Sequence, residues 1–192
     1  MPSQRTVSIL LAFILATVLT ACGNISNVRA FNRNYQEPTE GDRAQLRVSV
    51  QGGMVRGVPG KDCIDWGVPE SGVIAITMGG FADPKRSPIP MPAPSATTKQ
   101  FRSAGRFEEA EVYIPAGKPM TLDYLSSGGR YQCFVHQSFL PERDANYEAL
   151  FRLNGSSCEF LVLKISEGPL GVTMQEKVPL SKASLCSVWD VL

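Results

Sequence analysis

The chain carries few side chains arranged for acid–base or nucleophilic catalysis. His136 is its single histidine, so a mechanism of the Ser-His-Asp or Cys-His kind would have to use it. Asp62 and Asp65 lie close to Trp66, and two carboxylates beside a ring that stacks on sugars would suit glycan hydrolysis. We interpret the aspartates as turn residues, Trp66 as an anchor in the core or at its rim, and His136 as a surface or half-buried strand residue. The sequence therefore predicts no enzyme, no catalytic residue and no cofactor.

Residues 1–22 have the layout of an export signal. Arg5 precedes an apolar run over residues 6–19, which is shorter than the roughly 20 residues that a membrane-spanning helix needs. The run ends in the tetrapeptide LTAC, whose last residue is Cys22, and this tetrapeptide resembles the lipobox of bacterial lipoproteins. The resemblance implies cleavage before Cys22, acylation of that cysteine with chains such as palmitate, and a lipid anchor in the bacterial cell envelope. By class analogy Gly23 favours the outer membrane, facing the periplasm; an ordinary signal peptide or an uncleaved anchor is the alternative.

Two further observations bear on the partners of the exported chain. Residues 35–50 (YQEPTEGDRAQLRVSV) resemble the start of small envelope lipoproteins of Gram-negative bacteria. The chain has 19 Lys+Arg and 18 Asp+Glu, and removal of Arg5 with the signal leaves the mature protein neutral. A neutral chain without basic clusters is poorly suited to bind nucleic acid or anionic lipid headgroups. We therefore expect the lipid on Cys22 to hold the protein at the membrane, and no nucleic-acid partner.

Four cysteines follow the one in the lipobox, and an even number in an exported domain favours two disulfides. Four cysteines permit three pairings, and the sequence alone does not choose among them; we favour Cys133–Cys158 with Cys63–Cys186. A zinc site is the alternative, but no two of the four have the spacing of about two to four residues that such sites use. We therefore predict two disulfides and no metal. The four residues are Cys63, Cys133, Cys158 and Cys186.

Short segments with the periodicity of strands begin at residue 44. Residues 44–50 alternate apolar and polar side chains, as in a half-buried strand. Residues 73–78 form a continuous apolar run, which is typical of a central strand buried on both faces. Links rich in glycine and proline separate these segments, and the only helical signal is a turn near residues 141–146. We predict an all-β domain, a single antiparallel β-sandwich or small barrel of about eight or nine strands. The remaining expected strands are 109–114, 120–124, 130–139, 146–153, 158–165, 171–178 and 185–192.

The predicted organisation is a signal peptide over residues 1–21, a lipidated N-terminus and polar tether over 22–43, and the β domain over 44–192. Residues 83–98 (DPKRSPIPMPAPSATT) interrupt the strand pattern with five prolines, which favour extended backbone and remove hydrogen-bond donors. We expect a loop outside the sheet, which is either a mobile insertion or a partner-binding arm. The densest acidic cluster is interpreted as the solvent face of the following strand; it consists of Glu108, Glu109 and Glu111.

These observations favour a membrane-anchored envelope lipoprotein that binds a protein partner or supports an assembly, without catalysis. One alternative is a periplasmic inhibitor or immunity lipoprotein, in which residues 83–98 enter the active site of a toxin or lysozyme-like enzyme. Another is a small-ligand carrier or hydrolase whose polar groups are Asp62, Asp65 and His136. This last alternative requires a deep groove that gathers the three side chains.

Overall fold

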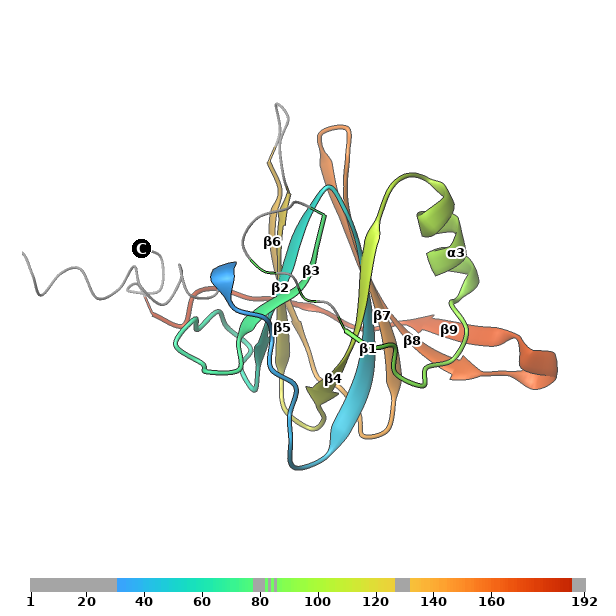
Figure 1. The fold of residues 1–192 in the computed structure, drawn as a ribbon, viewed down its shortest axis with the longest axis horizontal. Coiled ribbons are helices and arrows are strands. Elements are labelled where there is room, and N and C mark those ends of the chain that lie inside the picture. Colours follow the sequence, from blue (N-terminus) through green and yellow to red (C-terminus); the bar gives the residue numbers. More distant parts are fainter. Residues whose placement is uncertain (1–30, 78–81, 83, 85, 127–131, 188–192) are drawn as a thin grey trace, which may run out of the picture.

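The chain folds into an all-β sandwich of two five-stranded sheets (Figure 1). The computed structural model describes residues 31–77, 82, 84, 86–126 and 132–187. Its strands are β1 Arg43–Gln51, β2 Gly53–Pro59, β3 Gly72–Ile76, β4 Glu108–Pro115, β5 Met120–Ser126, β6 Phe134–Phe139, β7 Asn146–Asn154, β8 Ser157–Glu167, β9 Thr173–Lys177 and β10 Ser181–Lys182. The first sheet has the order β4-β1-β7-β8-β9 and the second β10-β6-β5-β2-β3. The predicted all-β sandwich is confirmed, with about ten strands in place of eight or nine.

The core lies between the sheets because their strands alternate apolar and polar side chains. In β1, Leu46, Val48 and Val50 point into the sandwich and are fully buried, as the alternation predicted. β1 pairs antiparallel with β4 and parallel with β7, whereas the other ladders between named strands are antiparallel. Gly52 takes a positive φ of 65° between β1 and β2, a conformation that glycine adopts without strain. The chain passes there from the first sheet to the second.

The apolar run expected to form a central strand forms β3 at the edge of the second sheet. The N-terminal segment around Tyr35 pairs with the outer edge of β3. Tyr35 N–H donates to the carbonyl of Val73 at 2.9 Å, and Val73 N–H donates to the carbonyl of Arg33 at 2.8 Å. Gly72 permits this approach, because a Cβ there would lie 2.4 Å from the Arg33 carbonyl oxygen. At Val73 the backbone of β3 is therefore paired on both sides, although β3 is last in the strand order.

The same contact brings part of the expected tether into the folded domain. Tyr35 is only 1% exposed and belongs to the main core, although it falls within residues 22–43. The domain therefore begins before residue 44. Cys22 itself lies outside the described residues.

One helix was missed by the sequence analysis. α3 (Ala96–Ser103) follows the prolines, and its N-cap residue Ser95 accepts a hydrogen bond from Thr98 N–H. The helix has eight residues, of which only Thr98 and Phe101 are buried, so its apolar periodicity is too short to recognise. None of the described helices is long and apolar enough to cross a membrane.

The C-terminal strand predicted over residues 185–192 is represented in the described residues by a single bridge. Leu185 pairs with Ile64 in the loop after β2. Residues 188–192 lie outside the described part of the chain. The last regular strand described is therefore the two-residue β10.

Candidate functional site

Both predicted disulfides form, in the pairing that the sequence analysis favoured. Cys133 is bonded to Cys158, which joins the residue before β6 to the start of β8 and so links the two sheets. Cys63 is bonded to Cys186, which ties the loop after β2 to the segment after β10. Hydrogen bonds of Ile64 with the carbonyl of Ser184 and the N–H of Cys186 support the second bridge. All four cysteines of the domain therefore have a structural role.

The residues considered for hydrolysis are not gathered in one of the grooves. Asp62 is exposed, and Asp65 accepts a hydrogen bond from Gly67 N–H at 2.9 Å, as a turn residue does. Trp66 is 3% exposed and packs in a small apolar cluster beside β2. Five grooves of about 160 to 480 Å³ are lined by described residues, and none of these five includes Asp62, Asp65 or His136. The carrier or hydrolase alternative therefore lacks the groove it requires among these five.

His136 belongs to a polar row that the sequence analysis missed. Arg56 of β2, Asp123 of β5 and His136 of β6 are neighbours in register across the second sheet. Arg56 Nε donates to Asp123 Oδ2 at 2.7 Å, and the other carboxylate oxygen lies 2.6 Å from His136 Nδ1. The guanidinium of Arg56 lies between two rings, 3.7 Å from the centre of Trp66 and 3.9 Å from that of Phe31. The row thus fastens the loop after β2 and the N-terminal segment to the outer face of this sheet.

The carboxylate of Asp123 is held ionised by its neighbours. The side chain is 2% exposed, and burial alone would raise its pKa. The positive charge of Arg56, together with contact and hydrogen bonding by His136, outweighs burial and lowers the pKa of Asp123 below its ordinary value. Both oxygens are occupied by side chains of the same protein, so this carboxylate is an electrostatic anchor rather than an open general base.

We expect Asp123 to make folding acid-sensitive. Because its folded pKa is lower than the unfolded value of about 3.9, its stabilisation is complete above that value and is lost as the pH falls through the folded pKa. The unfolding free energy of the wild type should therefore drop below about pH 4, and Asp123→Asn should remove this part of the slope. Urea unfolding across the acid range measures both slopes, with the exposed Asp62→Asn as a matched control. If the unfolding free energy changed equally with pH in the wild type and in Asp123→Asn, Asp123 would not be the source of the acid sensitivity.

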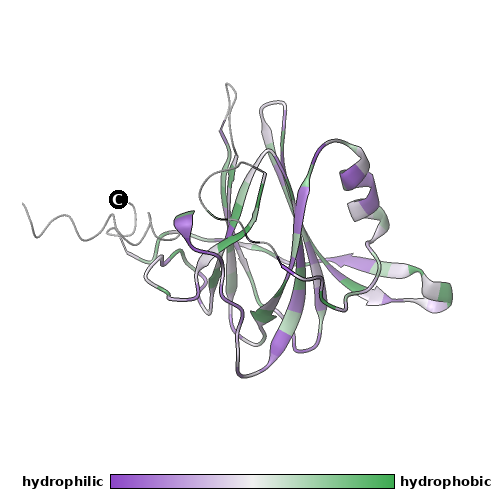
Figure 2. Ribbon diagram, in the orientation of Figure 1, coloured by the Kyte–Doolittle hydropathy of each residue, from purple (hydrophilic) through white to green (hydrophobic). Residues whose placement is uncertain are grey.

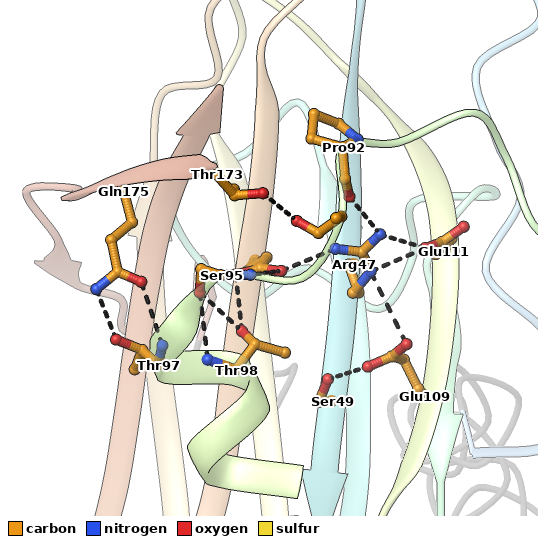
Figure 3. Close-up of polar contacts among 12 residues, drawn as sticks. Arg47, Ser49, Pro92, Ser95, Thr97, Thr98, Glu109, Glu111, Thr173 and Gln175 are labelled. Carbon is orange, nitrogen blue, oxygen red and sulfur yellow. Dashed lines mark hydrogen bonds and ion pairs between the residues drawn. The ribbon is translucent and has the colours of Figure 1, made fainter. Parts of the chain in front are cut away.

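The prediction that the acidic cluster at the start of β4 faces solvent is wrong for two of its three members. Glu109 and Glu111 point toward Arg47 of β1 on the outer face of the first sheet (Figure 3). Arg47 is 4% exposed; its Nε donates to Glu111 Oε1 at 2.8 Å and its Nη1 donates to Glu148 Oε1 at 2.8 Å. Glu148 of β7 is fully buried. Only Glu108 is exposed as expected.

The Pro-rich segment is the cover that buries this cluster. Arg47 Nη2 donates to the carbonyl of Pro92 at 3.0 Å (Figure 3). Ser95 N–H donates to Glu148 Oε1 at 3.2 Å, and Thr98 Oγ1 donates to Glu148 Oε2 at 2.7 Å. The described part of residues 83–98 is therefore bonded to the sheet at several points. This packing does not support its use as an arm that enters the active site of another protein.

A different segment extends away from the body of the molecule. β8 and β9 continue beyond the sandwich as a two-stranded hairpin, whose tip is apolar (Figures 1 and 2). A short 3₁₀ turn, Pro169–Gly171, holds Leu170 at a positive φ of 60°. Leu170 is fully exposed, and Val172 and Met174 are 59% and 55% exposed. Apolar side chains grouped at an exposed tip are typical of a contact with another molecule.

The largest of the five grooves, about 480 Å³, lies beside α3 on the outer face of the first sheet. α3 contributes Phe101, and Ala104 follows at its end; β7 contributes Leu150 and Arg152. β8 contributes four consecutive residues, 158–161. The floor is mainly apolar, and its charged rim residues are bonded to each other, since Arg152 Nε donates to Glu159 Oε2. Neither the groove nor the projecting tip was found from the sequence.

Comparison with protein-family models, with curated proteins and with solved structures found no match to this chain.

Proposed function

We propose that this protein is a lipid-anchored lipoprotein of the bacterial cell envelope whose β-sandwich acts as a non-enzymatic protein-binding module. The observation that carries the proposal is the projecting β8–β9 hairpin with three exposed apolar side chains at its tip. The two disulfides are consistent with export to an oxidising compartment. The anchor is expected at Cys22, and it would concentrate the module at the membrane.

The position of the tip supports a protein partner rather than the anchoring membrane. The described chain begins at Phe31, which packs on Arg56 at the outer face of the second sheet. The tip of the hairpin, at Leu170, extends from the first sheet at the opposite end of the molecule (Figure 1). A domain tethered through its N-terminus would therefore present this tip away from the bilayer.

The inhibitor or immunity alternative is favoured by the same hairpin, not by the Pro-rich segment. A leucine held at the end of a projecting hairpin is shaped to enter a cleft of another protein. Loss of protection against one defined toxin or lysozyme-like enzyme, upon deletion of the gene, would distinguish this alternative from a structural module.

The anchor is tested by Cys22→Ser. Without the acyl chains, the mature chain is neutral, and a neutral chain is not held at anionic lipid by electrostatic attraction. The variant should move from the membrane fraction to the soluble periplasmic fraction, as measured by fractionation and immunoblotting. Continued sedimentation of the variant with membranes would contradict lipid anchoring.

The tip is tested by Leu170→Asn, because asparagine tolerates the positive φ of this position while removing the apolar side chain. The control is Leu140→Asn, which replaces a leucine that is 61% exposed after β6. In-cell crosslinking followed by purification from membranes should yield one dominant partner with the wild type and the control. That partner should be lost with Leu170→Asn; an unchanged set of partners in all three would remove the tip from the binding surface.

A further inference from the structure

The start of β8 is an open sheet edge beside the 480 Å³ groove. β9 pairs with β8 only from Leu163 to Glu167. One further bond, from Val178 N–H to the carbonyl of Val162, closes this pairing, and Pro179 then lacks an N–H to continue it. The chain crosses from there to β10 in the other sheet. Among the described residues, no strand pairs with residues 157–161 on this side of β8.

The direction of the free backbone groups follows from the pairing of Val162. Its carbonyl points toward the β9 side of β8, and successive residues of a strand alternate the side to which their N–H and C=O groups point. The N–H and C=O groups of Phe160 and Cys158 therefore point to the same open edge. The N–H and C=O groups of Glu159 and Leu161 point to β7. The pairing of β7 with β8 runs without a register shift through this stretch, so the alternation is uninterrupted.

The groove and the edge form one surface. Cys158, Glu159, Phe160 and Leu161 all line the groove although their side chains point alternately to the two faces, so the backbone of β8 itself borders it. Cys158 is exposed, and the next three residues are half-buried. An added strand would satisfy the free backbone groups and could place a side chain on the apolar floor formed by Phe101 and Leu150.

The N-terminal end of the described chain and the segment after β9 lie elsewhere, and a second copy paired about Glu159 fits this edge poorly. Two copies pairing edge to edge about the centre of residues 157–161 would place Glu159 opposite Glu159 of the second copy, and like charges directly opposed are destabilising. The described N-terminal end, at Phe31, packs on the outer face of the other sheet. The segment after β9 has already crossed to the second sheet. An extended segment of another protein is the occupant that the free backbone groups of Cys158 and Phe160 suit.

We infer that residues 157–161 of β8 and the groove beside α3 bind an extended peptide segment of a partner protein by strand addition. The peptide supplies backbone hydrogen bonds to Cys158 and Phe160 and inserts an apolar side chain between α3 and β7. Proline within the paired stretch is excluded, because it lacks the N–H that the edge requires. This site is separate from the β8–β9 tip on which the proposed function rests.

A random peptide library of about ten residues, displayed on phage and selected against the protein purified from membranes in detergent, tests the inference. Selected peptides should carry alternating apolar residues and no central proline. Ala104→Trp places a large side chain in the groove from an exposed position, so it should weaken binding of these peptides roughly tenfold or more. Leu170→Asn, at the distant tip, is the matched control and should bind them as the wild type does.

Hydrogen exchange provides a readout specific to the edge. Bound peptide should slow exchange of the Cys158 and Phe160 amides and leave the amides of Glu159 and Leu161, which face β7, unchanged. Failure to select any peptide, equal binding by Ala104→Trp, or unchanged exchange at Cys158 and Phe160 would each overturn the inference. These outcomes are independent of the fractionation of Cys22→Ser and of partner loss with Leu170→Asn, so failure of this site and failure of the proposed function are distinguishable.

Discussion

Replacing Arg47 by methionine should destabilise the protein by about 3–5 kcal/mol, because it leaves a buried carboxylate without its counter-charge. Arg47 is 4% exposed and Glu148 is fully buried, and the guanidinium also contacts Glu111 and the carbonyl of Pro92. Methionine fills similar space but neutralises nothing. Urea unfolding of the disulfide-intact protein should show the loss as a lower midpoint with an unchanged slope.

The matched control is Arg143→Met. Arg143 is 69% exposed and pairs with Asp42 and Asp144 at 3.3 and 3.4 Å, so its removal should change stability by only about 0–1 kcal/mol. A second readout reports on the Pro-rich segment, since Arg47→Met should expose the bonds after Lys99 and Arg102 in α3 to trypsin. Comparable losses for the two substitutions, or equal resistance of α3 to trypsin, would show that the buried network does not hold this segment.

The sheets were predictable from the sequence because burial and alternation are local properties. β1 and the strands of the C-terminal half follow the two-residue period that a half-buried strand requires. The place of β3 was not predictable, because an apolar run indicates burial but does not say what provides it. In this protein, the neighbour on one side of β3 is the segment around Tyr35. That segment is polar in composition, and the sequence predicted it to be a tether.

Burial of the polar side chains Asp123 and Glu148 could not be predicted from the sequence either. Asp123 follows Leu122 and precedes Tyr124, so the alternation places it on the face opposite the core, and that face is commonly solvated. Its burial arises from Arg56 and from the loop around Trp66 that covers the sheet. Burial of Glu148 depends in the same way on the Pro-rich segment. A single sequence does not reveal which outer face a distant segment will cover, so both clusters became visible only in the fold.

Removing the Cys63–Cys186 bridge should cost more stability than removing Cys133–Cys158. The two bonds close loops with sequence separations of 123 and 25 residues. In the chain-entropy description these loops correspond to about 5 and about 3.5 kcal/mol of constraint on the unfolded state. Paired substitution by alanine, Cys63→Ala with Cys186→Ala and Cys133→Ala with Cys158→Ala, measures each bridge by urea unfolding. Thiol titration of the denatured wild type should find no free thiol.

The positions of the two bridges in the fold favour the opposite order of stability losses. Cys63–Cys186 ties down a C-terminal segment whose bonds to the domain include those at Ile64, so its loss could release that segment alone and cost little. Cys133–Cys158 joins the two sheets, and Cys133 is fully buried, so its loss also loosens packed side chains. A larger loss from the Cys63–Cys186 pair would show that constraint of the unfolded chain dominates. The reverse order would show that native packing across the sandwich dominates, and it would contradict the prediction. Because domains of this size are stable by about 5–15 kcal/mol, removal of both bridges should leave the sandwich close to unfolding.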